Sequence, residues 1–140
     1  MFTGSHNHTM DEKGRIKMPA KYREELGSRF VVTRGHDKCL YIYTSAEWEK
    51  VSAKVANLPK NDENARKYSR IFFSGMDIVD MDAQGRFPVS QMLREYAGLK
   101  KDVVVVGNSN TLEIWDKDRW DEYNIDVDDL GDLDMSAFDI

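Results

Sequence analysis

The stretch DEKGRIKMPAKYREELG at residues 11–27 returns 71 positions later as DAQGRFPVSQMLREYAG at residues 82–98. After a one-residue insertion the similarity continues at a spacing of 72, from residues 35–48 to residues 107–120. About forty residues therefore occur twice, and such a repeat indicates two copies of one folding unit. Because a unit of about 45 residues is marginally stable alone, we expect the two copies to share one core.

The hydrophobic periodicity of both copies is typical of a mainly β protein with short helices, of the α+β class. In the first copy we expect strands at residues 6–10, 15–18, 30–33 and 40–43, and helices at 20–26 and 44–58. In the second copy we expect strands at residues 78–81, 86–89, 103–106 and 111–115, and helices at 91–97 and up to about 123. Pro19 is expected to open the first helix, Gly27 to close it in a left-handed conformation, and Ser90 to cap the equivalent helix.

This pattern divides the chain into four segments. The first repeat covers residues 5–48, connecting helices cover 49–76, and the second repeat covers 77–120. Residues 124–140 contain six Asp and no Lys or Arg, so we expect this acidic tail to be flexible in part.

The motif D-x-x-G-R opens both repeated stretches. The carboxylates of Asp11 and Asp82 can accept hydrogen bonds from backbone amides two residues further on, and Gly14 and Gly85 can adopt the positive φ of a tight hairpin. We therefore expect these four residues to shape turns.

The strand that follows the first turn alternates strictly. Ile16 and Met18 face one side, so Arg15 and Lys17 face the other, with Lys13 close to them at the turn. Guanidinium groups on such a face can bind phosphates or reach guanine edges with two hydrogen bonds. The alternative is that Arg15 only braces the turn through an ion pair with the aspartate.

The charge of the chain is unevenly distributed. The net charge is −5, but residues 1–70 hold 14 Lys/Arg against 9 Asp/Glu, and residues 71–140 hold 6 against 16. An anionic partner for the first half is therefore compatible with the acidic total. A single cysteine, Cys39, excludes an internal disulfide and fits a reducing cytoplasm. The sequence has no signal-peptide pattern and no apolar run long enough for a membrane helix.

The double D-x-x-G-R motif, with HTMDEKGR, FVVTRG, FFSG and LREYAGLKKDVVVVG, resembles the MraZ family of the SpoVT-AbrB-like superfamily. The resemblance implies two tandem, pseudo-symmetric swapped-hairpin units that form a double-barrel-like core. It also implies a transcriptional regulator of the cytoplasm and nucleoid that binds promoter repeats of its own cell-division and cell-wall operon as a ring-like homo-oligomer. The DNA-contacting motifs carry over to Asp11 with Arg15 and Asp82 with Arg86.

The second copy departs from the family pattern. Gln84 stands where the first copy has Lys13, and Pro88 stands where it has Lys17. Proline cannot donate to a sheet ladder, so this strand is expected at an edge or a bulge. Copy two thus keeps only Arg86 of the three basic side chains.

These observations lead to a set of expected roles. Lys13, Arg15, Lys17 and Arg86 are candidates for DNA contact, whereas the repeated Arg23 and Arg94 lie on helices and suggest a structural ion pair or a subunit contact. The repeated aromatic pairs Tyr43/Trp115 and Trp48/Trp120 suggest core or interface positions.

No other chemistry is indicated by the sequence. No nucleophile elbow, phosphate-binding loop or zinc-ligand spacing is present, so we expect no enzyme activity, cofactor, metal site or small-molecule substrate. The rival hypothesis is an oligomeric interaction scaffold without direct DNA contact, in which the turns are only turns. A hydrolase that uses the tail carboxylates is the remote alternative.

Overall fold

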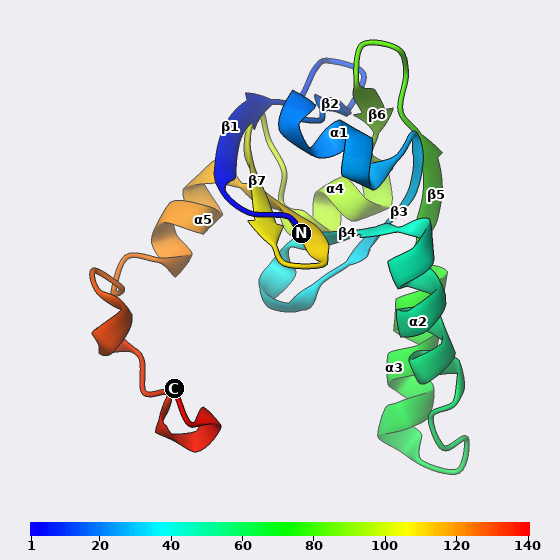
Figure 1. The fold of residues 1–140 in the computed structure, drawn as a ribbon. Helices are drawn as coiled ribbons and strands as arrows, with labels where there is room; N and C mark the ends of the chain where they lie inside the picture. Colours follow the sequence, from blue (N-terminus) through cyan, green and yellow to red (C-terminus); the bar gives the residue numbers. More distant parts are fainter.

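Eight β-strands and five α-helices form the chain, and a computed structural model describes all 140 residues (Figure 1). The elements of the first copy are β1 (Ser5–Thr9), β2 (Arg15–Lys17), α1 (Ala20–Leu26), β3 (Arg29–Arg34), β4 (Leu40–Thr44) and α2 (Ser45–Ala56). After α3 (Glu63–Ser74) follow β5 (Asp77–Asp80), β6 (Arg86–Pro88), α4 (Gln91–Ala97), β7 (Asp102–Asn108), β8 (Thr111–Asp116) and α5 (Lys117–Tyr123). The expected mixed fold, mostly antiparallel sheet with short helices, is confirmed.

The strands of the two copies are interleaved. The larger sheet has the order β1-β7-β8-β4-β3-β5, and β2 pairs with β6 in a separate two-stranded ribbon. Strand β1 of the first copy thus pairs with β7 of the second, and β5 of the second pairs with β3 of the first. Each copy lends its first hairpin to the other, so neither copy completes its sheet alone.

One core of 19 buried residues joins both copies. Ile16 and its counterpart Phe87 are fully buried there, and the Phe87 ring packs edge-on against Phe30 with centroids 5.2 Å apart. Burying one such side chain contributes about 1.5–3 kcal/mol. The expectation of a shared core is confirmed, and the ribbon that carries these two residues is anchored by them.

The short helices begin at residues that cap them. Ser90 Oγ accepts a hydrogen bond from the Leu93 N–H at 3.3 Å, as the sequence predicts. Pro19 lies one position before α1, with an extended ψ of 134°, and so precedes the first helical residue that we expected it to occupy.

The ends of α1 and α4 differ. Gly98 closes α4 in a left-handed conformation, with φ 61° and ψ 33°. Gly27 has a positive φ of 80° but an extended ψ of 169°, so the prediction of a left-handed cap there was wrong. The reason is that the chain turns at once into β3, which requires an extended backbone.

Helices α2 and α3 form a hairpin that projects from the body (Figure 1). The Trp48 ring stacks on Phe72 of α3 with centroids 5.1 Å apart and planes 11° apart. In the second copy Trp120 packs on Trp115 at 5.2 Å, which confirms that the repeated aromatics are packing residues.

The acidic tail, residues 124–140, follows α5 on the other side of the body (Figure 1). It contains two short 3₁₀ turns, Leu130–Asp132 and Ser136–Phe138, and none of its residues is buried. No helix anywhere in the chain has the length and apolar character needed to cross a membrane.

Candidate nucleic-acid interface

The first D-x-x-G-R turn is held by a single carboxylate. Asp11 Oδ1 accepts hydrogen bonds from the backbone N–H groups of Lys13 at 3.0 Å and Arg15 at 2.8 Å. Its other oxygen, Oδ2, accepts the Nε–H of Arg15 at 2.8 Å. Gly14 adopts a φ of 74°, and its N–H closes the turn on the Asp11 carbonyl at 3.0 Å.

The second turn repeats this arrangement. Asp82 Oδ1 accepts from the backbone N–H groups of Gln84 at 2.9 Å and Arg86 at 2.8 Å, and Oδ2 accepts the Arg86 Nε–H at 2.8 Å. Gly85 has a φ of 82°. The two aspartates and two glycines therefore make the contacts that a turn-shaping role requires.

These contacts favour the charged form of both aspartates. The backbone N–H of Arg15, supported by the guanidinium of the same residue, lowers the pKa of Asp11 below its ordinary value. The backbone N–H of Arg86 lowers the pKa of Asp82 in the same way. Each carboxylate is therefore held ionised by the residue that it orients.

The ribbon of β2 and β6 brings both copies onto one face. In its register Lys17 lies opposite Arg86, and Arg15 lies opposite Pro88. Cross-strand partners share a face, so these four side chains lie together, while the middle pair of the ribbon points into the core. The prediction that Pro88 lies in an edge-type strand is confirmed by this two-stranded ribbon.

Both turns are also tied to the opposite strand. The Met18 N–H donates to the Gly85 carbonyl at 2.7 Å, and the equivalent Val89 N–H donates to the Gly14 carbonyl at 3.0 Å. The turns and the ribbon therefore form one pseudo-symmetric unit.

The two ribbon arginines are less exposed than strand alternation predicts. The exposed fraction of the side chain is 28% for Arg15 and 36% for Arg86, because the Nε of each is bound to its aspartate. The terminal Nη groups make no hydrogen bond within the chain. Each guanidinium is thus oriented by the protein at one edge and free to bind an acceptor at the other.

Arg23 and Arg94 lie at positions that were not predicted from the sequence. The guanidinium of Arg94 lies against Gly14 in the turn of the first copy, and that of Arg23 lies against Gly85 in the turn of the second. Arg23 Nε also donates to the Met18 carbonyl at 2.9 Å.

Neither of these arginines forms an ion pair within the chain, so the ion-pair alternative was wrong, and the subunit contact stays a prediction. One feature of the sequence was consistent with this contact, because Arg23 and Arg94 recur in the two copies together with the turn glycines Gly14 and Gly85. A glycine is needed there because a Cβ would overlap the arginine of the other copy.

The pKa of His8 on β1 is affected by the positive charge near the ribbon. Its pKa is lowered first by burial and then by the positive groups of His6, Lys17 and Arg23. The neutral form of His8 is therefore favoured at pH 7. Lys13 adds a further exposed cation at the first turn, where the second copy has Gln84.

The structure contains no cluster of three or more His, Cys, Asp or Glu side chains that could hold a metal ion. Cys39 is buried, and its burial raises the pKa of the thiol far above the ordinary range.

Comparison with known proteins agrees with the resemblance seen in the motifs. The family model described as "MraZ protein, putative antitoxin-like" matches the chain twice, at residues 1–71 and 72–131. A protein of Acetivibrio thermocellus named transcriptional regulator MraZ is 45% identical over 137 residues, covering 98% of this chain and 92% of that protein. Proteins of the same name from Halothermothrix orenii and Clostridium acetobutylicum are 49% and 48% identical, covering 88% and 89% of this chain and 86% and 87% of their own length. The chain belongs to the MraZ family.

Proposed function

We propose that the chain is a sequence-specific DNA-binding regulator of transcription that acts without catalysis. The observation that carries this proposal is the ribbon face, on which Arg15, Lys17 and Arg86 converge with their terminal nitrogens available. The names of the relatives support the same function. Such a protein would act in the cytoplasm, at the nucleoid.

The ribbon has a shape suited to duplex DNA. The major groove of B-DNA admits a two-stranded β-ribbon, and bidentate contact of arginine with guanine is the commonest specific contact there. Arg15 and Arg86 would read base edges or bind phosphates, and Lys13 and Lys17 would bind phosphates beside them. Arg23 and Arg94, placed over the turns, would add charge to the same face.

The target and the assembly are also part of the proposal. Repeated boxes in the promoter of the chain's own cell-division and cell-wall operon would be bound by a ring-like homo-oligomer. A few basic contacts per chain bind weakly, whereas linked copies on adjacent boxes gain affinity through effective concentration. No small-molecule substrate, cofactor, metal or membrane enters this mechanism.

Single substitutions on the ribbon test the proposal. We expect Arg15→Ala to weaken promoter binding by about 5- to 150-fold, the equivalent of a lost base contact of about 1–3 kcal/mol. Arg86→Ala should cost less, because Lys13 and Lys17 flank Arg15 whereas Gln84 and Pro88 flank Arg86. The measurement is affinity for the promoter repeats and for a scrambled duplex of the same length.

The controls separate DNA contact from the scaffold alternative. Arg15→Lys keeps the charge but not the two-pronged geometry, so it should recover non-specific but not specific binding. Lys67→Ala removes a cation from α3, which lies in the projecting hairpin away from the ribbon (Figure 1), and should leave the affinity for the promoter unchanged. If Arg15→Ala and Arg86→Ala both fold and bind the promoter normally, the turns are only structural and another surface contacts DNA. If the folded wild-type chain binds neither the promoter nor the scrambled duplex, the scaffold hypothesis is favoured.

A further inference from the structure

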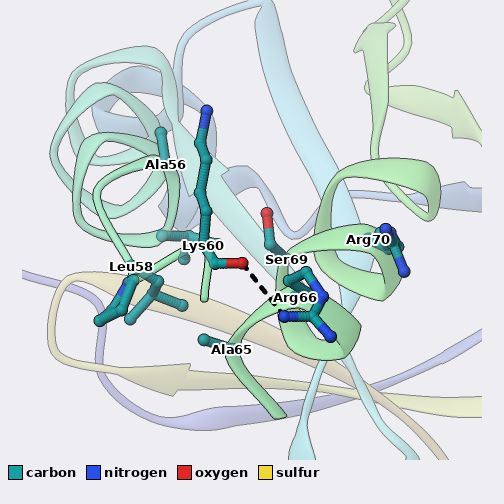
Figure 2. Close-up of a pocket in the computed structure, with 9 residues that line it drawn as sticks. Ala56, Leu58, Lys60, Ala65, Arg66, Ser69 and Arg70 are labelled. Atoms are coloured by element: carbon teal, nitrogen blue, oxygen red, sulfur yellow. Dashed lines mark hydrogen bonds between the residues drawn. The ribbon is translucent and has the colours of Figure 1, made fainter. Parts of the chain in front are cut away.

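A cleft between α2 and α3 has no role in the ribbon. Its volume is about 220 Å³, and it opens on the projecting helical hairpin (Figure 2). Ala56, Leu58 and Ala65 supply an apolar lining. A cleft of this size and character suits one or two aliphatic side chains.

The rim of the cleft is positively charged. Lys60, Arg66 and Arg70 surround it, and Arg66 Nη1 donates to the Lys60 carbonyl at 3.1 Å (Figure 2). None of these three cations takes part in an ion pair within the chain. The cleft therefore combines an apolar lining with uncompensated positive charge.

The acidic tail has the opposite character. Its six Asp carboxylates form no ion pair within the chain. Between them stand aliphatic side chains in water, with an exposed fraction of 84% for Leu130 and 48% for Leu133. The side-chain oxygens of Asp129 and Asp132 accept backbone N–H groups, which folds this part of the tail into a short turn.

The helical hairpin that contains the cleft and the acidic tail project from different parts of the body. Helix α2 follows β4 and α3 leads into the edge strand β5, whereas the tail follows α5, which contacts β7 and β8. Figure 1 shows the hairpin at the lower right of the body and the tail at the lower left. A contact between such surfaces joins two chains head to tail, and a head-to-tail contact generates a ring when its rotation closes.

We propose that the acidic tail of one copy docks in the basic-rimmed cleft of a second copy. Leu130 and Leu133 enter between the helices, and the neighbouring aspartates pair with Arg66 and Arg70. This inference rests on the assembly part of the proposed function and adds the contact that joins the copies. DNA is the less suitable occupant, because a phosphate backbone carries charge but offers no aliphatic group for the apolar lining.

Two full-length variants, each defective in one half of the contact, test this docking. The cleft variant is Arg66→Glu/Arg70→Glu, and the tail variant is Leu130→Asp/Leu133→Asp. Lys54→Glu/Lys67→Glu is the matched control, since it reverses two charges on the same helices at residues that form no ion pair within the chain and do not line the cleft. Sedimentation velocity at micromolar concentration gives the average mass against the 16.2 kDa of one chain.

We expect wild type and control to assemble, and each defective variant to self-associate about tenfold or more weakly. An equimolar mixture of the two variants should associate again, because one supplies an intact tail and the other an intact cleft. The tail variant alters only exposed residues, so we expect it to fold, and circular dichroism checks this. The tail variant therefore still tests the docking if the cleft variant unfolds.

The contrary outcomes are distinct. Wild-type assembly that both variants retain overturns the docking but leaves the proposed regulator intact. If both variants lose assembly and do not recover it on mixing, the tail and the cleft do not bind each other, and the docking is overturned. Loss of DNA affinity with unchanged mass in the cleft variant assigns the cleft to DNA instead. A wild-type chain that stays monomeric overturns both the docking and the assembly part of the proposed function.

Discussion

Asp11 and Asp82 each use the two oxygens of the carboxylate for two different sets of hydrogen bonds. One oxygen accepts two backbone N–H groups of the turn, and the other accepts the Nε–H of the following arginine. The aspartate thereby fixes the backbone and the direction of the guanidinium together. If this face binds DNA as proposed, a free carboxylate there would repel phosphates, but the charge of each aspartate is engaged by the arginine beside it.

This engagement predicts a specific acid sensitivity. Because the folded-state pKa of Asp82 lies below its ordinary value of 3.8, the unfolded chain binds more protons there at low pH. The stability that the charged form contributes is therefore fully present above about pH 3.8 and is lost as the pH falls through the folded-state pKa. We expect Asp82→Asn to lower the melting temperature at pH 7, with the deficit relative to wild type shrinking below about pH 3.8.

Glu12→Gln serves as the matched control for this prediction, because Glu12 is exposed in the other turn and its carboxylate makes no hydrogen bond. The measurement is thermal unfolding of wild type and both variants from pH 7 to pH 2.5. A deficit of Asp82→Asn that stays constant over this whole range would show that the carboxylate charge does not stabilise the turn.

At the scale of elements, the ribbon and the helices α1 and α4 are tied crosswise. Arg94 of α4 covers Gly14 at the turn before β2, and Arg23 of α1 covers Gly85 at the turn before β6. The helix of each copy thus supports the turn of the other. The position of the ribbon arginines then depends on contacts between the copies as well as on the local turn.

This crosswise contact predicts a coupling between Gly14 and Arg94. Gly14→Ala places a methyl group where the Arg94 guanidinium lies and also forces a side chain to a φ of 74°, so we expect a loss of about 1–3 kcal/mol. Arg94→Ala in the same chain should recover the steric part of this loss. Denaturant unfolding of wild type, both single variants and the double variant gives the coupling free energy.

Gly27→Ala is the control for the backbone part alone, since Gly27 also has a positive φ but has no atom within 4 Å of the added Cβ. Arg94→Ala should leave the cost of Gly27→Ala unchanged. Strict additivity between Gly14→Ala and Arg94→Ala would mean that the turn moves away from the helix without cost.

The elements themselves follow closely from local sequence. The bounds of α1 and α4 agree residue for residue with the predicted ranges 20–26 and 91–97, because a proline or a capping serine stands directly before each helix and a glycine directly after it. Which strands pair could not be predicted from the residues alone. Alternation in β1 tells which side chains face the core, but it does not tell whether β1 pairs within its own copy or with β7 of the other.

The same limit applies to the candidate site. The turn aspartates and the shared side of Arg15 and Lys17 could be predicted, since both arise within a few residues. The approach of Arg86 to Lys17 and of Arg94 to Gly14 could not, because each joins residues that are more than sixty positions apart in the sequence. These contacts are consequences of tertiary pairing and have no local periodic signal.

At the scale of the whole molecule, the exchange of hairpins makes the two copies one cooperative unit. The 19 core residues come from both copies, and the outer strand β5 is held by β3 of the first copy. Partial unfolding of one copy would remove strands from the other. The single ribbon face is therefore present only when the whole chain is folded, so the proposed DNA binding would depend on global stability.

The charge on this face predicts how binding responds to salt. Each phosphate neutralised by a lysine or arginine releases counterions, so the slope of log K against log salt is about −0.9 per phosphate contact. With Lys13, Arg15, Lys17 and Arg86 engaged, one bound chain should show a slope of about −3 to −4, and linked copies should show multiples of it. An affinity for the promoter repeats that does not change with salt would contradict phosphate contact by the ribbon.

The first turn carries Lys13 where the second carries Gln84, so the salt dependence can be tested by removing a cation from one turn and by adding one to the other. Lys13→Ala should reduce the magnitude of the slope by about 1 per bound chain and weaken binding to all sequences alike. Gln84→Lys restores at the second turn the cation that the first turn has, so it should steepen the slope by about 1 and strengthen binding. Both side chains are exposed and only their backbone N–H groups bond the turn, so neither change should alter folding. The readout is fluorescence anisotropy with the promoter duplex between about 50 and 200 mM salt. If Lys13→Ala flattens the slope while Gln84→Lys leaves it unchanged, the second turn lies away from the phosphates, and only the first copy's side of the ribbon contacts DNA.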